Sequence, residues 1–272
     1  MINVSVVVYK EDYKQLEKLV AVLCGEKLVN KVYVIDNSPG DYLKDIKSLS
    51  PKIEYIFTGD NLGYGRAHNI AIKKSIVSSI PYHIVINPDI SLANGVIEKL
   101  FFFMESNLNV SLIMPKILFP DGRTQFLCRL LPTPLDLILR RFLPFSRMLE
   151  KRNYNYELRF TGYNRLMSPP VMSGCFMFLR VNDLKEIGVF DERYFMYLED
   201  IDLIRRIRSK KQIIFYPEVS VYHEHNRGSY RNFRLLFQHI RSAFIYFNKW
   251  GWFFDSERKR INSLFLSEFG KN

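Results

Sequence analysis

The chain has 272 residues, 47% hydrophobic and 25% charged, a balance typical of a soluble globular protein with a substantial core. Its net charge of +11 comes from two zones: residues 123–165 carry nine Lys and Arg against three acids, and residues 223–272 carry nine against four. Such zones indicate a polyanionic partner, and three widely spaced cysteines without a Cys-x-x-Cys pair argue against a disulfide framework or a zinc site.

The sequence also predicts where the protein works. No secretory leader precedes the first strand, and no run reaches the roughly 18 apolar residues that a membrane-spanning helix needs. We therefore expect a cytoplasmic protein. Segments 134–145 and 250–260 are apolar and basic at once, which favours peripheral contact with the anionic inner face of the plasma membrane. The alternative is that these segments pack internally or form a homodimer contact.

The first third of the chain alternates strand and helix patterns. Strands are predicted at 4–9, 31–36, 53–57 and 83–87, and helices at 12–23, 64–77 and 92–104. Near-continuous apolar strands alternating with amphipathic helices predict an α/β fold, with a Rossmann-like, mostly parallel central sheet flanked by helices on both faces.

The rest of the chain is less regular. Residues 123–165 form a basic, Pro-interrupted insertion that we expect to be irregular. Apolar strands follow at 171–181, 213–216 and 219–222, with a helix at 199–208 between them. Apolar residues at three- and four-residue steps predict a helical C-terminal extension. The expected organisation is a catalytic domain over 1–222 and a basic helical segment over 223–272.

Polar residues follow each of the first four strands. They are Tyr9, Asp36, Asn37, Asn61, Asn87 and Asp89. Parallel sheets bind ligands outside the carboxyl ends of their strands, so these residues are candidates for holding a nucleotide. Each alone is also a common turn or helix-capping residue; four clusters at one sheet edge favour the binding interpretation.

The segment Asn61-Leu62-Gly63-Tyr64-Gly65 opens the second predicted helix. It lacks the third glycine of the dinucleotide fingerprint and follows the third strand, which argues against a Rossmann NAD site. A glycine pair at a helix start still lets backbone amides approach a phosphate.

Two further groups carry candidate chemistry. Asp89 is the strongest metal candidate, because a divalent ion that bridges phosphates needs oxygen ligands at a strand end. His223 ends the last strand and is a second candidate ligand. Beyond it stand phosphate-binding donors: Arg227, Ser229 and Arg231.

The segment 190–202 holds five carboxylates beside an aromatic run. Glu199, Asp200 and Asp202 open a predicted helix, where acids also favour the helix dipole. A carboxylate walled by these aromatics could serve as a general base.

Together these motifs resemble family 2 glycosyltransferases with the GT-A fold, closest to bacterial rhamnosyltransferases of O-antigen, capsule and cell-wall polysaccharide assembly. The resemblance covers roughly residues 1–250. It is carried by Asp36-Asn37-Ser38, Asn61-x-Gly63-x-Gly65-x-x-x-Asn69, Asn87-Pro88-Asp89, Ser173-Gly174-Cys175, Gly188-x-Phe190-Asp191-Glu192, Phe195-x-x-x-Glu199-Asp200-x-Asp202 and His223…Ser229.

The resemblance implies roles for these residues. Asp200 is the base that deprotonates the acceptor hydroxyl, with Glu199 beside it. Asp89 and His223 hold Mg²⁺ or Mn²⁺. The implied nucleotide-sugar contacts are Tyr9, Asp36, Asn37, Asn61, Gly63, Gly65, Asn69, Asn87, Gly174, Arg227, Ser229 and Arg231. Three positions depart from the family pattern: Lys10 after the first strand, Asn87 in place of a carboxylate, and Cys175 in place of the more usual Ala.

The implied reaction is inverting transfer of a sugar, with rhamnose from dTDP-rhamnose as the first expectation. The acceptor is expected to be a saccharide, free or linked to a lipid diphosphate. A UDP-hexose or galactofuranose donor is the alternative within the same fold. From other classes, a nucleic-acid-binding protein and a nucleotide-sugar pyrophosphorylase are the rivals; the first lacks a recognisable motif and the second lacks a glycine-rich loop after the first strand.

Overall fold

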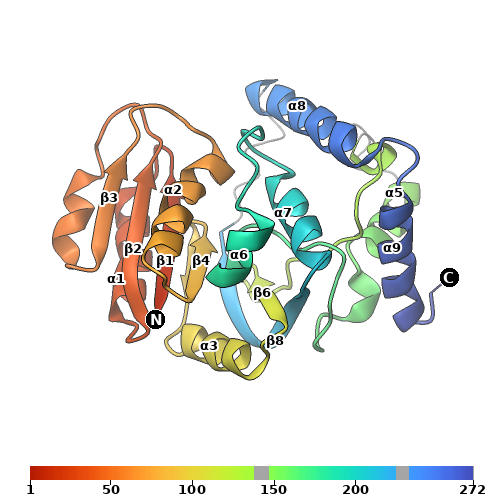
Figure 1. Ribbon diagram of the computed structural model, residues 1–272, viewed down its shortest axis with the longest axis horizontal. Helices are drawn as coiled ribbons and strands as arrows, with labels where there is room; N and C mark the ends of the chain where they lie inside the picture. The colour runs from red at the N-terminus through yellow and green to blue at the C-terminus, as the bar shows by residue number, and fades with distance from the viewer. Residues whose placement is uncertain (138–146, 225–232, 272) are drawn as a thin grey trace.

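The structure is a computed structural model that describes residues 1–137, 147–224 and 233–271. Its centre is an eight-stranded sheet with the strand order β3-β2-β1-β4-β7-β6-β8-β5 (Figure 1). The strands are β1 Ile2–Val8, β2 Val29–Asp36, β3 Ile53–Phe57, β4 Tyr82–Ile86, β5 Ile90–Leu92, β6 Val110–Leu118, β7 Phe176–Arg180 and β8 Gln212–His223.

Helices cover the sheet and extend beyond it. They are α1 Tyr13–Gly25, α2 Tyr64–Val77, α3 Val96–Ser106, α5 Arg147–Tyr156, α6 Val181–Ile187, α7 Glu199–Arg208, α8 Phe233–Trp250 and α9 Ser256–Glu268, with short 3-10 turns at η1 Lys44–Leu49 and η2 Arg159–Thr161. None of the helices in the described residues is long and apolar enough to cross a membrane.

The strands β3, β2, β1 and β4 are mutually parallel, as predicted. Alternate residues of β1 face opposite sides of the sheet. Val4 and Val6 belong to the main core with the buried residues of α1, whereas Ser5 hydrogen-bonds to His68 of α2. The carboxyl ends of these strands therefore lie along one edge, which is the geometry that the strand-end polar residues require.

The other half of the sheet is mixed. β7 runs antiparallel between β4 and β6, β8 runs parallel to β6, and β5 pairs antiparallel with the end of β8. The sequence patterns missed β6 and β5, and α3 begins at Val96 because Ile90–Leu92 is a strand. The strands expected at 213–216 and 219–222 are one strand, whose register against β6 shifts between Pro115 and Lys116.

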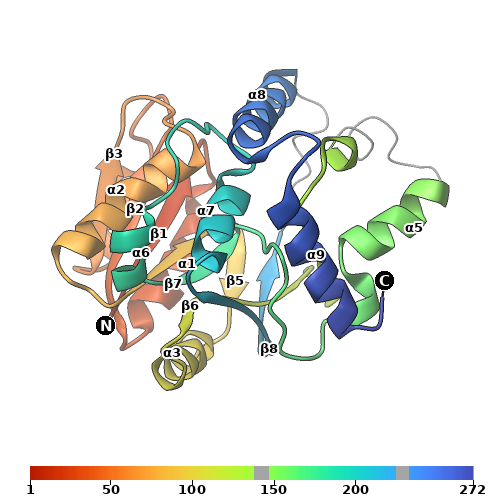
Figure 2. The ribbon, with the colours of Figure 1, turned by 45° about the vertical axis from the view of Figure 1, so that its right-hand side comes forward.

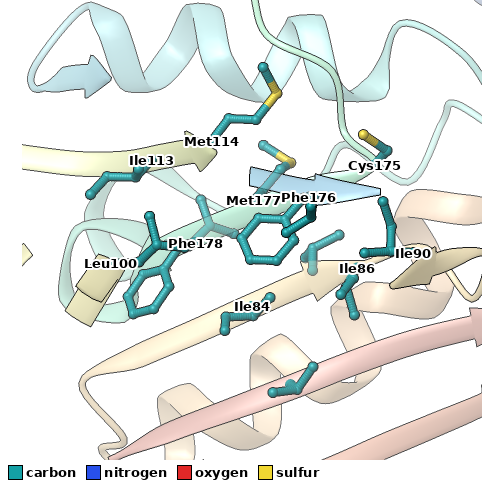
Figure 3. Close-up of a cluster of buried hydrophobic side chains, with 14 of the residues drawn as sticks. Ile84, Ile86, Ile90, Leu100, Ile113, Met114, Cys175, Phe176, Met177 and Phe178 are labelled. Atoms are coloured by element: carbon teal, nitrogen blue, oxygen red, sulfur yellow. The ribbon is translucent and has the colours of Figure 1, made fainter. Parts of the chain in front are cut away.

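The core lies where the parallel and mixed halves meet. Figure 3 shows Ile84 and Ile86 of β4 beside Phe176 and Phe178 of β7, with Cys175 where the core approaches the strand ends. These side chains are at most 5% exposed. Their burial supplies the apolar contacts that hold β7 against β4 and so fixes the position of the segment that precedes β7.

The C-terminal helices are joined to the catalytic part by a buried ion pair. Arg205 of α7 donates two hydrogen bonds to Asp255, at 2.6 and 2.7 Å, and stacks on Trp250. Figures 1 and 2 show α8 above α7 and α9 beside α5. The insertion 123–165 is more ordered than predicted, because α5 and a 3-10 turn lie within it; residues 138–146 are outside the described residues.

Candidate active site

The site forms where β4 ends, next to the start of the antiparallel strand β7. The Asn87 backbone N–H donates to the Cys175 carbonyl at 2.9 Å, which ties the two segments together. Tyr64, the first residue of α2, places its hydroxyl 2.8 Å from the Gly174 carbonyl and 3.0 Å from the Asn87 side-chain oxygen. Burial raises the pKa of Tyr64 well above its usual range, so this hydroxyl remains a neutral donor.

Tyr64, Asn87 and Gly174 together form a group that we call the platform. Asp200 is held against this platform by backbone amides. The Gly174 N–H donates to Oδ2 at 2.9 Å, and the Ile201 N–H donates to Oδ1 at 2.8 Å. A Cβ at position 174 would lie 3.1 Å from the Asp200 Cβ, so a glycine permits this approach. Tyr197 and Leu198, directly before α7, both have positive φ angles, a strained backbone of the kind found at functional sites.

Asp200 and Glu199 form a pair of neighbouring buried carboxyls. Burial, and then the charge of Asp200, raises the pKa of Glu199. Burial also raises the pKa of Asp200, but the Gly174 and Ile201 amides and the Arg129 guanidinium oppose that shift. Since the carboxylate that accepts hydrogen bonds is the easier one to ionise, Asp200 is the member of the pair better suited to accept a proton.

Arg129 is a site residue that the sequence patterns did not identify. Its backbone pairs with Val171, three residues before Gly174, through two hydrogen bonds of 2.9 Å. Its Nε is buried without a hydrogen-bond partner among the described residues. Burial lowers its pKa, but the neighbouring Tyr156, Glu157 and Asp200 raise it by more. The segment read as an irregular basic insertion thus supplies a cation beside the candidate base.

Asp89 and His223 meet at the far side of the platform. Antiparallel pairing of Ile90 with His223 brings them together, and His223 Nε2 lies 3.2 Å from Asp89 Oδ1. Asp89 Oδ1 is buried and accepts no hydrogen bond from the described residues. An orphaned carboxylate oxygen beside an imidazole nitrogen fits a divalent cation, whose neighbouring ligands lie about 3 Å apart in an octahedral site.

The protein supplies only part of such a coordination shell. Within the described ranges, no group of three or more His, Cys, Asp or Glu side chains could hold a metal ion. Two protein ligands would leave positions for phosphates and water, as Mg²⁺ sites commonly do. Glu11, after β1, is near enough for the charge of Asp89 to help raise its pKa, although burial is the main cause.

The residues expected to contact the nucleotide differ in how exposed they are and in whether their polar atoms already bond to the protein. Tyr9 is 49% exposed at the end of β1, with Lys10 Nζ 5.6 Å from its ring centroid. Asp36 is fully buried, and its oxygens accept from the Ser38 N–H at 2.8 Å and the Tyr55 hydroxyl at 2.7 Å. The Tyr9 ring is therefore open to a base, whereas the Asp36 carboxylate already has protein partners.

Asn37 and Asn61 likewise bond within the protein. The Asn37 amide donates to the Gly63 carbonyl at 3.0 Å, and Asn61 Oδ1 accepts from the Gly63 N–H at 3.0 Å. Both side chains shape the turn before α2. Their expected contact with the nucleotide remains a prediction.

Gly63 and Gly65 are explained by close packing. Gly63 has a φ of +84°, and a Cβ there would lie 2.1 Å from the Phe195 carbonyl oxygen; a Cβ at Gly65 would lie 2.8 Å from the Phe190 Cβ. The amides expected to meet a phosphate are engaged at Gly63, by Asn61, and at Tyr64, which donates to Phe195 at 2.9 Å. The glycines bring the 189–198 loop, and with it Asp200, against α2.

Asn69 has a similar internal role. Its side chain donates to the Phe190 carbonyl at 2.9 Å and to Glu192 at 3.0 Å, and accepts from the Phe190 N–H at 3.0 Å. It is 1% exposed. Asn69 thus clamps the loop that precedes α7, and the Gly174 amide and carbonyl likewise bond to Asp200 and Tyr64. The expected contact of both residues with the nucleotide remains a prediction.

Three expected phosphate ligands, Arg227, Ser229 and Arg231, lie outside the described residues. Of the site residues that the patterns missed, Tyr64 stood inside a quoted motif, between its two glycines. Gln125, whose side-chain oxygen lies 3.0 Å from His223 Nδ1, and Arg129 follow the turn formers Asp121-Gly122 after an apolar stretch. That is the signal of a hairpin, and it pointed to a chain reversal beside the sheet.

A sheet of this order, with an acid after its fourth strand and a pair of buried carboxyl groups opening a late helix, is the arrangement of the GT-A class of nucleotide-sugar-dependent transferases. Residues 4–188 match the family described as glycosyl transferase family 2. The chain belongs to that family, and the resemblance noted in its motifs is confirmed.

Relatives and solved structures agree with this assignment. Rhamnosyltransferase WbbL of Escherichia coli (strain K12) is 25% identical over 264 residues, covering 94% of this chain and 95% of that protein. The N-acetylglucosaminyl-diphospho-decaprenol L-rhamnosyltransferase of Mycobacterium tuberculosis (strain CDC 1551 / Oshkosh) is 27% identical over 213 residues, covering 72% and 67%.

Among solved structures, GalNAc-T7 with UDP, GalNAc and Mn²⁺ has a TM-score of 0.62 at 16% identity, over 84% of this chain and 44% of that one. Residues 1–349 of S. aureus TarS have a TM-score of 0.56 at 15% identity, over 82% and 60%. At these identities the likeness establishes the fold.

Proposed function

We propose that the protein is an inverting rhamnosyltransferase that moves rhamnose from dTDP-rhamnose to a saccharide acceptor in surface-polysaccharide synthesis. The observation that carries the proposal is the arrangement around Tyr64. Its hydroxyl joins the segment before Asp89 to the segment that holds Asp200, so a cation-binding carboxylate and a base flank one platform. That is the arrangement needed for a hydroxyl to attack a sugar while a diphosphate leaves.

Asp200 is the proposed base. Its two oxygens are fixed by the Gly174 and Ile201 amides, which leaves further lone pairs for the acceptor hydroxyl proton. The attacking oxygen forms a bond to the anomeric carbon as the bond to the diphosphate breaks, so a single displacement inverts the configuration. Buried Glu199, holding its proton, avoids a second negative charge beside the base.

Asp89 and His223 are the proposed ligands of Mg²⁺ or Mn²⁺. When bound, the cation would neutralise charge that develops on the departing nucleoside diphosphate. The orphaned Asp89 oxygen and the 3.2 Å separation from His223 Nε2 support the assignment. The fold neighbour GalNAc-T7, which was crystallised with UDP and Mn²⁺, supports it further.

The sugar and the acceptor are inferred from relatives. Both bacterial relatives carry rhamnosyltransferase in their names, and the name of the mycobacterial protein specifies a diphospho-decaprenol acceptor. These similarities favour a lipid-diphosphate-linked acceptor. A UDP-hexose donor is the alternative, since the 27% identical Agl10 of Haloferax volcanii is named a hexosyltransferase.

A thermal-shift panel with dTDP, UDP, GDP and CMP, each with and without Mn²⁺, tests the donor site. Ligand at about 100 times its Kd should add about 2.7 kcal/mol of stability. We expect a Mn²⁺-dependent rise in Tm with dTDP, and a matched Asp89→Ala variant should lose the Mn²⁺-dependent part. A larger shift with UDP would favour the hexose alternative, and no shift with any nucleotide would contradict the proposal.

The proposal includes peripheral contact with anionic membrane through an exposed surface of α8. Phe237, Ile240 and Phe244 share one face of that helix and are 42–65% exposed. The Phe244 ring lies 5.0 Å from Trp252, next to Phe253 and Phe254, which are 79% and 98% exposed.

The charges on the C-terminal helices suit an anionic lipid. Arg241 of α8 and Lys259 and Arg260 of α9 are exposed, whereas Asp255 and Glu257 are occupied by Arg205. Two residues expected at the membrane are internal instead. Trp250 donates to Asp202, and Arg258 is 7% exposed.

Vesicle flotation tests the membrane contact. Phe237→Ser/Phe244→Ser/Phe254→Ser should abolish binding to vesicles that contain phosphatidylglycerol, whereas Phe102→Ser, on the exposed face of α3, should not. Equal binding of the wild type to neutral and anionic vesicles would contradict it.

A further inference from the structure

Gln125 lies beside His223 because the chain reverses after β6. The Phe119 N–H donates to the Arg123 carbonyl at 2.7 Å, and Leu118 and Thr124 pair as an antiparallel bridge. The Gln125 N–H then donates to the Ile117 carbonyl at 2.9 Å. Since β6 also pairs with β8, with Leu118 opposite Tyr222, this hairpin brings Gln125 to the end of β8.

The orientation of the Gln125 amide is fixed by its neighbours. Its Nε2 group donates to the His223 carbonyl at 2.7 Å and to the Leu118 carbonyl at 3.3 Å. A flipped amide would place Oε1 against these two carbonyl oxygens, which cannot donate. Gln125 is 4% exposed, so water could not compensate for the two lost bonds.

This orientation determines the tautomer of His223. Gln125 Oε1 lies 3.0 Å from His223 Nδ1, and an oxygen that only accepts requires a proton on Nδ1. In the neutral imidazole the lone pair is then on Nε2, the nitrogen 3.2 Å from Asp89 Oδ1.

We propose that Gln125 is a positioning residue that locks His223 as the Nδ1–H tautomer and so presents Nε2 as a cation ligand beside Asp89. The inference rests on the proposed metal-dependent transfer but concerns a residue outside the coordination shell. Without the Gln125 amide, the Nε2–H tautomer would become accessible. It carries a proton on the nitrogen that faces Asp89, where a cation ligand needs a lone pair.

The tautomer of the wild type can be read directly by NMR on protein labelled with ¹⁵N-histidine, with His223→Asn identifying the signal. We expect the Nδ1–H form in the wild type at a pH where the ring is neutral. The Nε2–H form in the wild type would overturn the proposal, and this measurement does not depend on any Gln125 variant.

Gln125→Met keeps the length of the side chain and removes its amide. We expect it to shift His223 toward the Nε2–H form and to weaken Mn²⁺ binding, measured by calorimetry with the metal alone, by about 10–100-fold. Gln212→Met, at an exposed position that begins β8, is the matched control and should change neither measurement. An unchanged tautomer and Mn²⁺ affinity in folded Gln125→Met would refute the role.

The two proposals can fail separately. If Gln125→Met changes the tautomer but neither protein binds Mn²⁺, the positioning role of Gln125 stands and the metal-dependent part of the proposed function fails.

Discussion

The proposed nucleotide side and the proposed reacting side of this site differ in how many of their buried polar atoms have hydrogen-bond partners. On the nucleotide side, Asp36, Asn37 and Asn69 are at most 2% exposed and use their polar atoms on neighbouring protein groups. On the reacting side, buried atoms of Asp89 and Glu199 accept no hydrogen bond from the described residues.

This difference separates residues that stabilise the fold from residues that are proposed to take part in the reaction. A satisfied buried polar residue stabilises one conformation, and its loss leaves unpaired groups behind. An unsatisfied buried carboxylate lowers the stability of the free protein but is available to a substrate or cation. Substitutions on the nucleotide side should therefore reduce stability more than turnover, and substitutions on the reacting side should do the reverse.

The largest effect is expected for Asp200→Asn. Loss of the base should reduce kcat by about 10³-fold or more, while the nucleotide-induced rise in Tm stays as in the wild type. Asp202→Asn on the same helix is the contrast. Asp202 is bound by Arg206, Trp250 and Lys249, so its loss should lower stability instead. Near-normal turnover by Asp200→Asn would show that another group is the base.

Asn69→Ala tests the comparison on the proposed nucleotide side. The change leaves the Phe190 N–H and carbonyl without their partner, and we expect the free energy of unfolding to fall by about 2–4 kcal/mol in urea titrations. Nucleotide affinity of the folded variant should be unchanged. Weaker nucleotide binding at wild-type stability would instead restore Asn69 as a ligand contact.

Arg129→Met should move the pH profile of kcat/KM. Asp200 must be ionised to accept a proton, so activity falls as the pH drops through its pKa. Because the Arg129 charge lowers that pKa, its removal should move the acid limb to higher pH, with severalfold less activity on the acid side and little change above it. Arg129→Lys should restore much of the profile, and a uniform loss at every pH would indicate a structural role.

The smallest effect is expected for Glu199→Gln. Because the pKa of Glu199 is raised in the folded protein, ionisation at higher pH favours the unfolded chain, and stability declines as the pH rises through that pKa. Glutamine does not ionise, so Glu199→Gln removes this loss of stability. The variant should be about 1 kcal/mol more stable than the wild type at pH 9, measured by urea unfolding across the pH range. A steeper fall in the variant's free energy of unfolding with rising pH than in the wild type would contradict this prediction.

Much of the fold was readable from the sequence because it depends on local pattern. The bounds of α2, α7 and β3 are those predicted, since each is a periodic segment between clear turn signals. The strand-end positions of Asp36 and Asp89 followed from the same patterns and from parallel pairing. Their order along the chain also carried the family resemblance.

The tertiary structure decided which of these residues have their polar atoms occupied by the protein itself. Asn69 and Gly63 stood in recognisable motifs, but only the packing of the 189–198 loop shows that they hold that loop. Gln125 and Arg129 reach the site through a hairpin and a bridge to Val171, contacts between segments far apart in sequence. A local pattern reports which face of an element is buried. The pairing of β7, β6 and β8 depends on the packing of the whole core. That pairing in turn decides the partner of each buried polar atom.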